Sequence, residues 1–333
     1  MKYLLSKWSE DQLKLGLFAV VMVVLFMAIA VTLNQIPLMR LKSDIFLRWY
    51  ATGKLFSEGR DLYDVQNSVE VDNIVYGQDS GLASGFYYPA QMLLFTAPLS
   101  ILPYRTAHII WTISVQLFYF IAIWVVSAYI NWPARLNQRI LFLMAVVLSI
   151  PSLQHTIWGQ FNTIGILALA LSYIALRKYK LVLSGILATG LTFKPHVSIL
   201  TLLFLLIWAI CKKARWSFLT GAAVGGIFVW LLAEIMQPKW LFSFFSSLGR
   251  YIPVKSVVDM IWNPYQVVSI FLVAGSLLIF LRNRNTDVNS PEFTGGFVLS
   301  MSVWALVIPI VGMFHVMVLP IGIILLASYY RQQ

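Results

Sequence analysis

The sequence predicts an all-α protein that crosses a membrane many times, and three observations lead to this fold class. Of its 333 residues, 59% are hydrophobic and only 11% are charged, whereas a soluble domain carries about 25% charged residues. The apolar residues fall into successive runs of roughly the length of a membrane span. The basic residues gather in the short segments between those runs, as they do in cytoplasmic loops.

The apolar runs predict about ten spans within a single transmembrane domain, residues 1–333. The first run, 15–33, has no charged residue. It is longer than the 7–15-residue core of a signal peptide, so we expect an uncleaved first span. A shorter run, 91–102, lies between two prolines and predicts a segment that is re-entrant or lies in the membrane interface. The other predicted spans are 106–130, 140–157, 162–176, 181–193, 196–211, 216–236, 264–281, 294–312 and 313–330.

The basic residues predict the orientation of these spans. If the N-terminus is inside, 14 of the 24 lysines and arginines fall in short inside segments, as the positive-inside rule requires. We therefore expect a plasma-membrane protein with both termini cytoplasmic. The net charge of +11 reflects this bias rather than nucleic-acid binding, because no long basic run is interleaved with aromatic residues. The inside residues are Lys2, Lys7, Lys14, Arg135, Arg139, Arg177, Lys178, Lys180, Lys212, Lys213, Arg215, Arg282, Arg284 and Arg331.

Two longer loops then lie outside. The first covers residues 34–105 when the 91–102 run is included, and the second covers 237–263. Seven of the chain's 13 acidic residues lie in the first loop. Ser43 is a suitable N-cap for a helix beginning at Asp44, and apolar residues recur after it at helical spacing. This pattern predicts an amphipathic helix on the outer leaflet. Asp44 itself either serves a site or simply stabilises the helix N-terminus.

Further polar residues fall at the outer ends of the predicted spans. Gln160 and Asn162 follow the third span, Lys194 and His196 lie between the fifth and sixth, and His315 follows the ninth. Taken singly, each has an ordinary explanation, since loop amides are often structural and a lysine at a span end commonly extends its amine to the interface. All of them, however, fall on the same predicted side of the membrane, and this favours a functional site. With Asp44, they suit chemistry on an anionic substrate at the outer membrane surface.

No metal site is visible in the sequence. The four histidines lack H-x-x-x-H spacing, no D-x-D pair occurs, and Cys211 is the only cysteine. We therefore name no metal ligand and expect no cofactor, while metal dependence is left open. The single cysteine also excludes an internal disulfide.

A series of short motifs follows one another along about 280 residues. Asp44 comes first, and the rest are G-R-D-L-Y-D at 59–64, Y-Y-P at 87–89, A-P-L at 97–99, G-Q-F-N at 159–162, F-K-P at 193–195 and F-H-x-x-x-L-P at 314–320. In this order they resemble the membrane glycosyltransferases of the GT-C fold. The closest resemblance is to glycosyltransferase family 87, which includes polyprenol-phosphate-mannose-dependent mannosyltransferases. Family members often have Y-P-P where this chain has Tyr88-Pro89-Ala90.

The resemblance implies an inverting transfer on the external face. The donor would be a polyprenyl-phosphate sugar, with mannose expected, and the acceptor a hydroxyl of a lipid or glycan. Asp44 would be the catalytic base, and Lys194 would hold the donor phosphate. His315 would assist at either the phosphate or the acceptor. The remaining assignments are Arg48, Arg250 and Lys255 as weaker phosphate ligands, Gln160 and Asn162 as groups that bind the sugar or position Lys194, and Tyr88 and His196 as further substrate-binding residues.

Two other classes of function are compatible with a polytopic chain. A transporter or lipid flippase would need polar residues at mid-bilayer in broken helices, with repeat symmetry between the halves. Here the polar residues gather at one face and no internal repeat is found. A non-catalytic assembly subunit would tolerate the loss of Asp44. The sequence leaves the donor sugar, the acceptor and the oligomeric state open.

Overall fold

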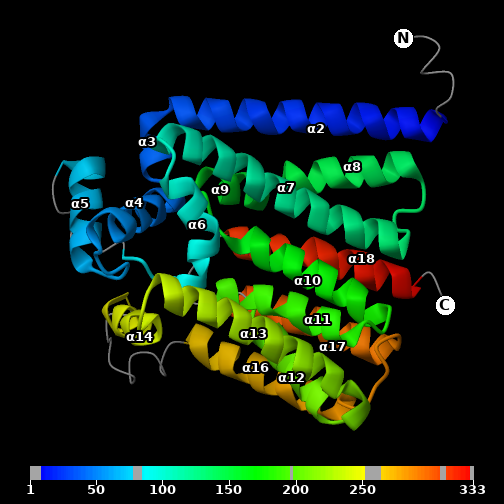
Figure 1. Cartoon of the computed structure of the whole chain (residues 1–333). Coiled ribbons are helices and arrows are strands. Elements are labelled where there is room, and N and C mark those ends of the chain that lie inside the picture. The colour runs from blue at the N-terminus through cyan, green and yellow to red at the C-terminus, as the bar shows by residue number, and fades with distance from the viewer. Residues whose placement is uncertain (1–8, 78–84, 196–197, 252–263, 308–312, 331–333) are drawn as a thin grey trace.

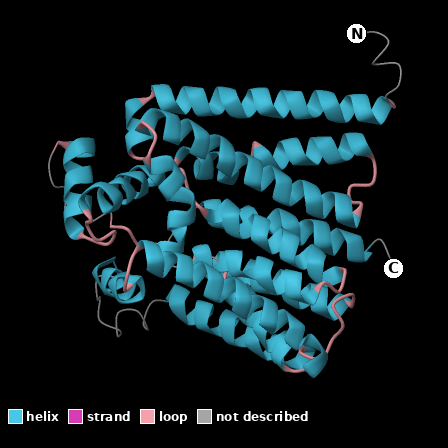
Figure 2. Cartoon of the chain, in the orientation of Figure 1, coloured by secondary structure: helices cyan, strands magenta, loops and turns pink. Residues whose placement is uncertain are grey.

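The computed structural model describes residues 9–77, 85–195, 198–251, 264–307 and 313–330. Its regular structure is helical throughout, and these residues contain no strand (Figure 2). The bundle consists of α2 (Glu10–Gln35), α7 (Tyr104–Ile130), α8 (Leu136–Val147), α9 (Ile150–Ile157), α10 (Asn162–Arg177), α11 (Leu181–Ala188), α12 (Ile199–Ile210), α13 (Trp216–Met236), α16 (Pro264–Asn283), α17 (Pro291–Val307) and α18 (Leu319–Tyr330).

Shorter elements lie at the ends of the bundle. Figure 1 shows the bundle helices side by side, with both chain ends at one end of the bundle and α4, α5 and α14 at the other. The shorter elements are α3 (Pro37–Leu41), α4 (Asp44–Glu58), α5 (Val65–Tyr76), η1 (Ala90–Met92), α6 (Leu93–Ser100), η2 (Thr189–Phe193), η4 (Lys213–Arg215), α14 (Trp240–Tyr251) and η5 (Met313–Val318).

Local sequence signals set the ends of the first long helix. The N-terminus of α2 has a capping box, in which Ser9 and Gln12 each accept a hydrogen bond from the other's backbone N–H. Ile36 precedes Pro37, and a residue before proline disfavours helical backbone. Accordingly, Ile36 is extended and α2 ends at Gln35.

The helices support a polytopic membrane fold. Among the described residues, three helices are long and apolar enough to cross a membrane: α2, α7 and the segment Lys213–Met236. A fourth span results if α8 and α9, bent by 49° at their junction, cross together. Within the described residues, the other apolar stretches have 10–17 residues when α11 and η2 are taken together and α16 is counted from Val267, so the count of ten spans stays a prediction. Helix α6, at the 91–102 run, has eight residues and rises about 12 Å, well short of a hydrocarbon core of about 30 Å.

The basic loops lie at the same end of the bundle as the two termini (Figure 1). Hydrogen bonds connect them there. Arg215 donates to the carbonyl of Arg284 at 2.6 Å, and Arg177 donates to the carbonyl of Val288 at 3.2 Å. The described basic residues of these loops therefore share one end of the bundle, as the positive-inside rule requires, while the side of the membrane that this end faces stays a prediction.

Helix α4 begins at Asp44, as the sequence predicts. Ser43 occupies the N-cap position, but its side chain makes no capping hydrogen bond. The apolar face of α4, which includes Ile45 and Phe46, is buried and packs against α5, α6 and α7. Helix α4 is therefore covered by protein on its apolar face, which fixes its first turn relative to the bundle.

Helices α11 and α13 approach each other closely through glycines. A Cβ at Gly221 would overlap the carbonyl oxygen of Val182, and a Cβ at Gly185 would overlap that of Phe218. Small residues at such crossings let helix backbones come into contact within a membrane. The spacing Gly221-x-x-x-Gly225 places two such residues on the same face of α13.

We expect Gly221→Ala to destabilise the bundle by about 1–3 kcal/mol, because the added methyl group forces two backbones apart. Gly226→Ala is the matched control, since a Cβ there meets nothing within 4 Å and alanine is the better helix former. Thermal unfolding of the detergent-solubilised proteins measures the difference. Equal midpoints for the two variants would contradict the close crossing.

Candidate active site

Segments far apart in the sequence meet at the end of the bundle opposite the termini. The first turn of α4 is tied there to the loop between α9 and α10, because the backbone N–H of Asp44 donates to the carbonyl of Trp158 at 2.7 Å. Gly159 follows with φ +59°, and a Cβ on it would overlap Ser43 Oγ. Glycine is thus required both by the left-handed backbone and by the contact that positions Asp44.

The carboxylate of Asp44 is held by two donors. Its Oδ1 lies 2.8 Å from Arg48 Nη1, because residues four apart share one helix face. Its Oδ2 accepts a hydrogen bond of 2.7 Å from the hydroxyl of Tyr88. The side chain of Arg48 is 8% exposed and that of Asp44 17%, so the acid keeps limited access to the outside while the arginine is buried.

The ring of Tyr88 lies against two cations. Arg48 Cζ is 4.8 Å from the ring centroid, and Lys194 Nζ is 5.4 Å from it. Tyr88 is buried, and its ring packs on Phe161 with centroids 5.0 Å apart. One side chain therefore contacts the carboxylate and both cations.

Lys194 is buried just after η2, outside the apolar helices that flank it. Its ammonium donates to Gln160 Oε1 at 2.6 Å. Burial lowers the pKa of Lys194 to about 7; the nearby Asp44 opposes this shift and Arg48 adds to it. An anion that reached the ammonium would therefore meet a group poised to gain full charge on binding.

Gln91 fixes the segment that carries Lys194. Its Nε2 donates to the carbonyl and the hydroxyl of Thr192, each at 3.1 Å. Phe95 and Phe193 pack edge to face beside this contact. The chain after Tyr88 is thereby fastened to the chain before Lys194.

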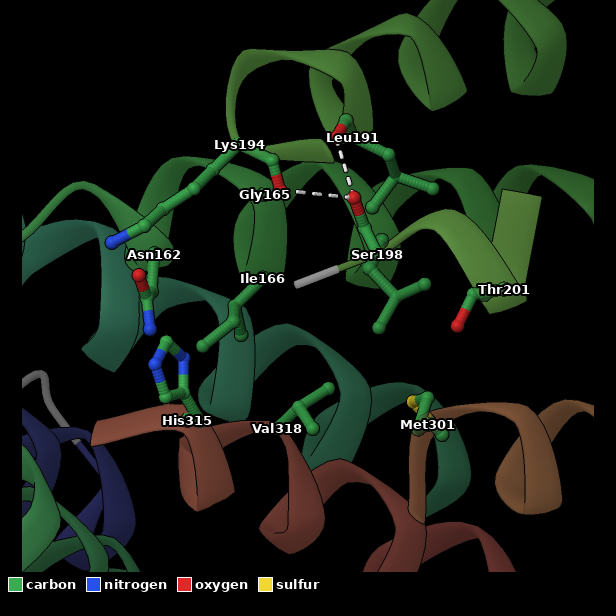
Figure 3. Close-up of a pocket in the computed structure, with 11 residues that line it drawn as sticks. Asn162, Gly165, Ile166, Leu191, Lys194, Ser198, Thr201, Met301, His315 and Val318 are labelled. Atoms are coloured by element: carbon green, nitrogen blue, oxygen red, sulfur yellow. Dashed lines mark hydrogen bonds between the residues drawn. The ribbon is translucent and has the colours of Figure 1, made fainter. Parts of the chain in front are cut away.

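Asn162 and His315 complete the group around Lys194. All three line a cavity of about 30 Å³ between α10, η2 and η5. In Figure 3 their polar ends lie together at one end of the cavity, and Leu191, Met301 and Val318 lie beyond them. A cavity of this size holds about one or two water molecules. His315 and Asn162 are both buried.

The structure thus brings together seven of the residues singled out in the sequence: Asp44, Arg48, Tyr88, Gln160, Asn162, Lys194 and His315. Arg250 lies in α14, but its side chain is outside the described part of the structure, as are His196 and Lys255 altogether. Among the described residues, no group of three or more histidines, cysteines or acids could hold a metal ion.

The sequence did not single out three residues that belong to this region. Gln91 and Thr192 hold the two site segments together. His155 in α9 is 1% exposed, and its Nε2 has no hydrogen-bond partner among the described residues. Helix α9 packs against η5, which carries His315. A polar side chain within an apolar run was the available signal for all three.

This arrangement can remove a proton and bind an anion within one site. A partly accessible carboxylate can accept the proton of a hydroxyl, and two buried cations can stabilise negative charge that develops on a leaving oxygen. The sequence model of glycosyltransferase family 87 matches residues 86–330, a stretch that includes Tyr88 and Lys194 and begins after Asp44. No curated protein and no solved structure matches the chain.

Proposed function

Because the chain belongs to glycosyltransferase family 87, whose members are membrane glycosyltransferases of the GT-C type, we propose that it uses a polyprenyl-phosphate sugar as donor. Mannose is the first candidate for the sugar, and the acceptor is a hydroxyl of a lipid or glycan. The observation that supports this best is the carboxylate of Asp44 beside two buried cations, with Tyr88 in contact with all three.

In the proposed reaction, the acceptor oxygen attacks the anomeric carbon and Asp44 takes its proton. The bond between that carbon and the phosphate oxygen breaks, and its electron pair leaves with polyprenyl phosphate. Lys194 stabilises the charge that develops on the leaving oxygen. A single displacement of this kind inverts the configuration of the anomeric carbon, because the nucleophile enters opposite the leaving group.

Arg48, Asn162 and His315 are assigned to the phosphate side of the site. Arg48 binds Asp44 through Nη1, while its buried Nε has no hydrogen-bond partner among the described residues and so retains a donor. Asn162 and His315 are placed there because they line the same cavity as Lys194. Gln160 orients the lysine by accepting its hydrogen bond.

We further propose that this end of the bundle faces the outside of the plasma membrane. The basic loops and both described chain ends lie at the opposite end, which the positive-inside rule assigns to the cytoplasm. A lipid-linked donor fits an external site, since cytosolic nucleotide sugars do not reach that side. A transporter or flippase remains the alternative function and makes a different prediction in the same assay.

The test is sugar transfer by the full chain reconstituted in proteoliposomes with extracted membrane acceptors. We expect radiolabel to move from polyprenyl-phosphate mannose to the acceptor fraction, and none to move from GDP-mannose. Transfer from GDP-mannose alone would contradict a lipid-linked donor. Movement of intact donor between leaflets without product would favour the flippase.

A further inference from the structure

We propose that Tyr88 is a positioning residue, which sets the distance between the proton-accepting carboxylate and the cations that hold the donor phosphate. This inference rests on the proposed function. It assigns Tyr88 a different role from the substrate binding expected from the sequence. Its hydroxyl acts on Asp44, and its ring acts on Arg48 and Lys194.

The hydroxyl of Tyr88 orients the base. It donates to Asp44 Oδ2 at 2.7 Å, while Arg48 binds Oδ1 of the same carboxylate. With both oxygens held, the carboxylate plane cannot rotate freely. Each carboxylate oxygen has two acceptor positions, so Oδ2 can still receive the proton of an acceptor hydroxyl while Tyr88 is bound. The single phenolic proton is committed to Asp44 in this arrangement.

The ring of Tyr88 supports the two cations. Arg48 and Lys194 approach it at 4.8 and 5.4 Å from the centroid, distances at which a cation is attracted to an aromatic face. This attraction helps to hold two like charges close to one ring. The positions of both phosphate-binding groups therefore depend on where the ring lies.

The surroundings of Tyr88 leave its ring little freedom. Its carbonyl accepts a 2.9 Å hydrogen bond from the hydroxyl of Tyr63. Phe161 packs on the ring at 5.0 Å and Phe86 lies edge to face at 6.4 Å. Pro89 follows directly and restricts the backbone of Tyr88. The side chain of Tyr88 is thus held rigidly, with one contact to the Asp44 carboxylate and two to the cations.

Rigidity at this position matters for an inverting transfer. The base must lie on one side of the anomeric carbon and the leaving phosphate on the other, so their separation is fixed by the size of the sugar. A misplacement of about 1 Å can cost about a hundredfold in rate. A residue that contacts both groups is therefore expected to affect kcat beyond any effect on donor binding.

The test separates the hydroxyl from the ring. Tyr88→Phe keeps the ring and removes the hydroxyl, so we expect kcat to fall about 10- to 100-fold with the donor KM within about twofold. Tyr88→Leu removes the ring as well, and we expect the donor KM to rise at least about fivefold further. Tyr179→Phe is the matched control, because Tyr179 is 60% exposed near the basic end and bonds Asp287 there.

A second measurement does not depend on activity. Carbodiimide labelling of Asp44, followed by mass spectrometry, reports how firmly the carboxylate is held. We expect Tyr88→Phe to label at least about threefold faster than the wild type. An active Tyr88→Phe variant with unchanged kcat, or unchanged labelling, would overturn the inference. A wild type without transfer would contradict the proposed function instead, and the labelling rates would still decide whether Tyr88 holds Asp44.

Discussion

Replacing Asp44 with asparagine is expected to lower the rate of sugar transfer by about 10²–10⁴-fold, the usual contribution of a general base. Asparagine has nearly the same shape, and its amide oxygen can still accept the hydrogen bond from Tyr88. It cannot take the proton of the acceptor hydroxyl. We therefore expect the loss in kcat, measured as the initial rate of transfer at saturating donor, with little change in the donor KM.

The control for this variant is Asp64→Asn. Asp64 is the N-cap of α5 and accepts a hydrogen bond from the backbone of Gln66, and asparagine caps helices as well as aspartate does. The control removes one acid from the same end of the bundle (Figure 1) and should keep its activity. If Asp44→Asn transferred sugar at the wild-type rate, the base would have to be another group.

The α4 segment illustrates what the sequence can predict. The pattern around Ser43 and Asp44 correctly predicted a helix beginning at Asp44, because caps and periodicity are local properties. Local signals did not predict that Ser43 Oγ makes no capping bond. That oxygen lies against Gly159, where a Cβ would overlap it, and Gly159 is more than a hundred positions away in the chain.

The site shows the same division between local and long-range information. Its polar residues could be assigned to one end of the bundle because each follows an apolar run, and alternating spans return the chain to the same side. Their mutual contacts could not be derived. The hydrogen bonds from Tyr88 to Asp44 and from Gln91 to Thr192 join positions 44 and 101 apart. Such contacts depend on how helices pack, which a pattern within one segment does not specify.

The number of membrane spans is hard to predict from the sequence for a related reason. Helices α2 and α7 have 26 and 27 residues, enough to cross a bilayer by length alone. Helix α11 has only eight residues and continues into the 3-10 turn η2, which ends at Phe193, just before the buried Lys194. Hydropathy places both kinds of segment in the apolar part of the chain. Only the structure shows that the second kind stops short and is followed by a buried charged side chain at the end of the bundle.

Replacing Lys194 with methionine is expected to lower kcat/KM for the donor by about 10²–10³-fold, because a preorganised cation in a water-excluded site is lost. Methionine retains most of the length and volume of the side chain. Lys213→Met is the matched control, since Lys213 is exposed in η4 near the basic end. Equal kcat/KM for Lys194→Met and the wild type would remove Lys194 from the donor site.

The pH dependence gives an independent test of the same residue. Burial lowers the pKa of Lys194 to about 7, an effect that Asp44 partly opposes and Arg48 increases. Below that pH the free enzyme carries the ammonium, and above it the charge is progressively lost.

Because kcat/KM reports groups of the free enzyme, we expect kcat/KM for the donor to fall as the pH rises above about 7. The proposed donor, a polyprenyl-phosphate sugar, is a phosphodiester that does not titrate in this range, so the alkaline limb would belong to the protein. Lys194→Arg keeps its charge at all these pH values, and we expect the limb to disappear in that variant. An unchanged limb in Lys194→Arg would assign the titration to another group.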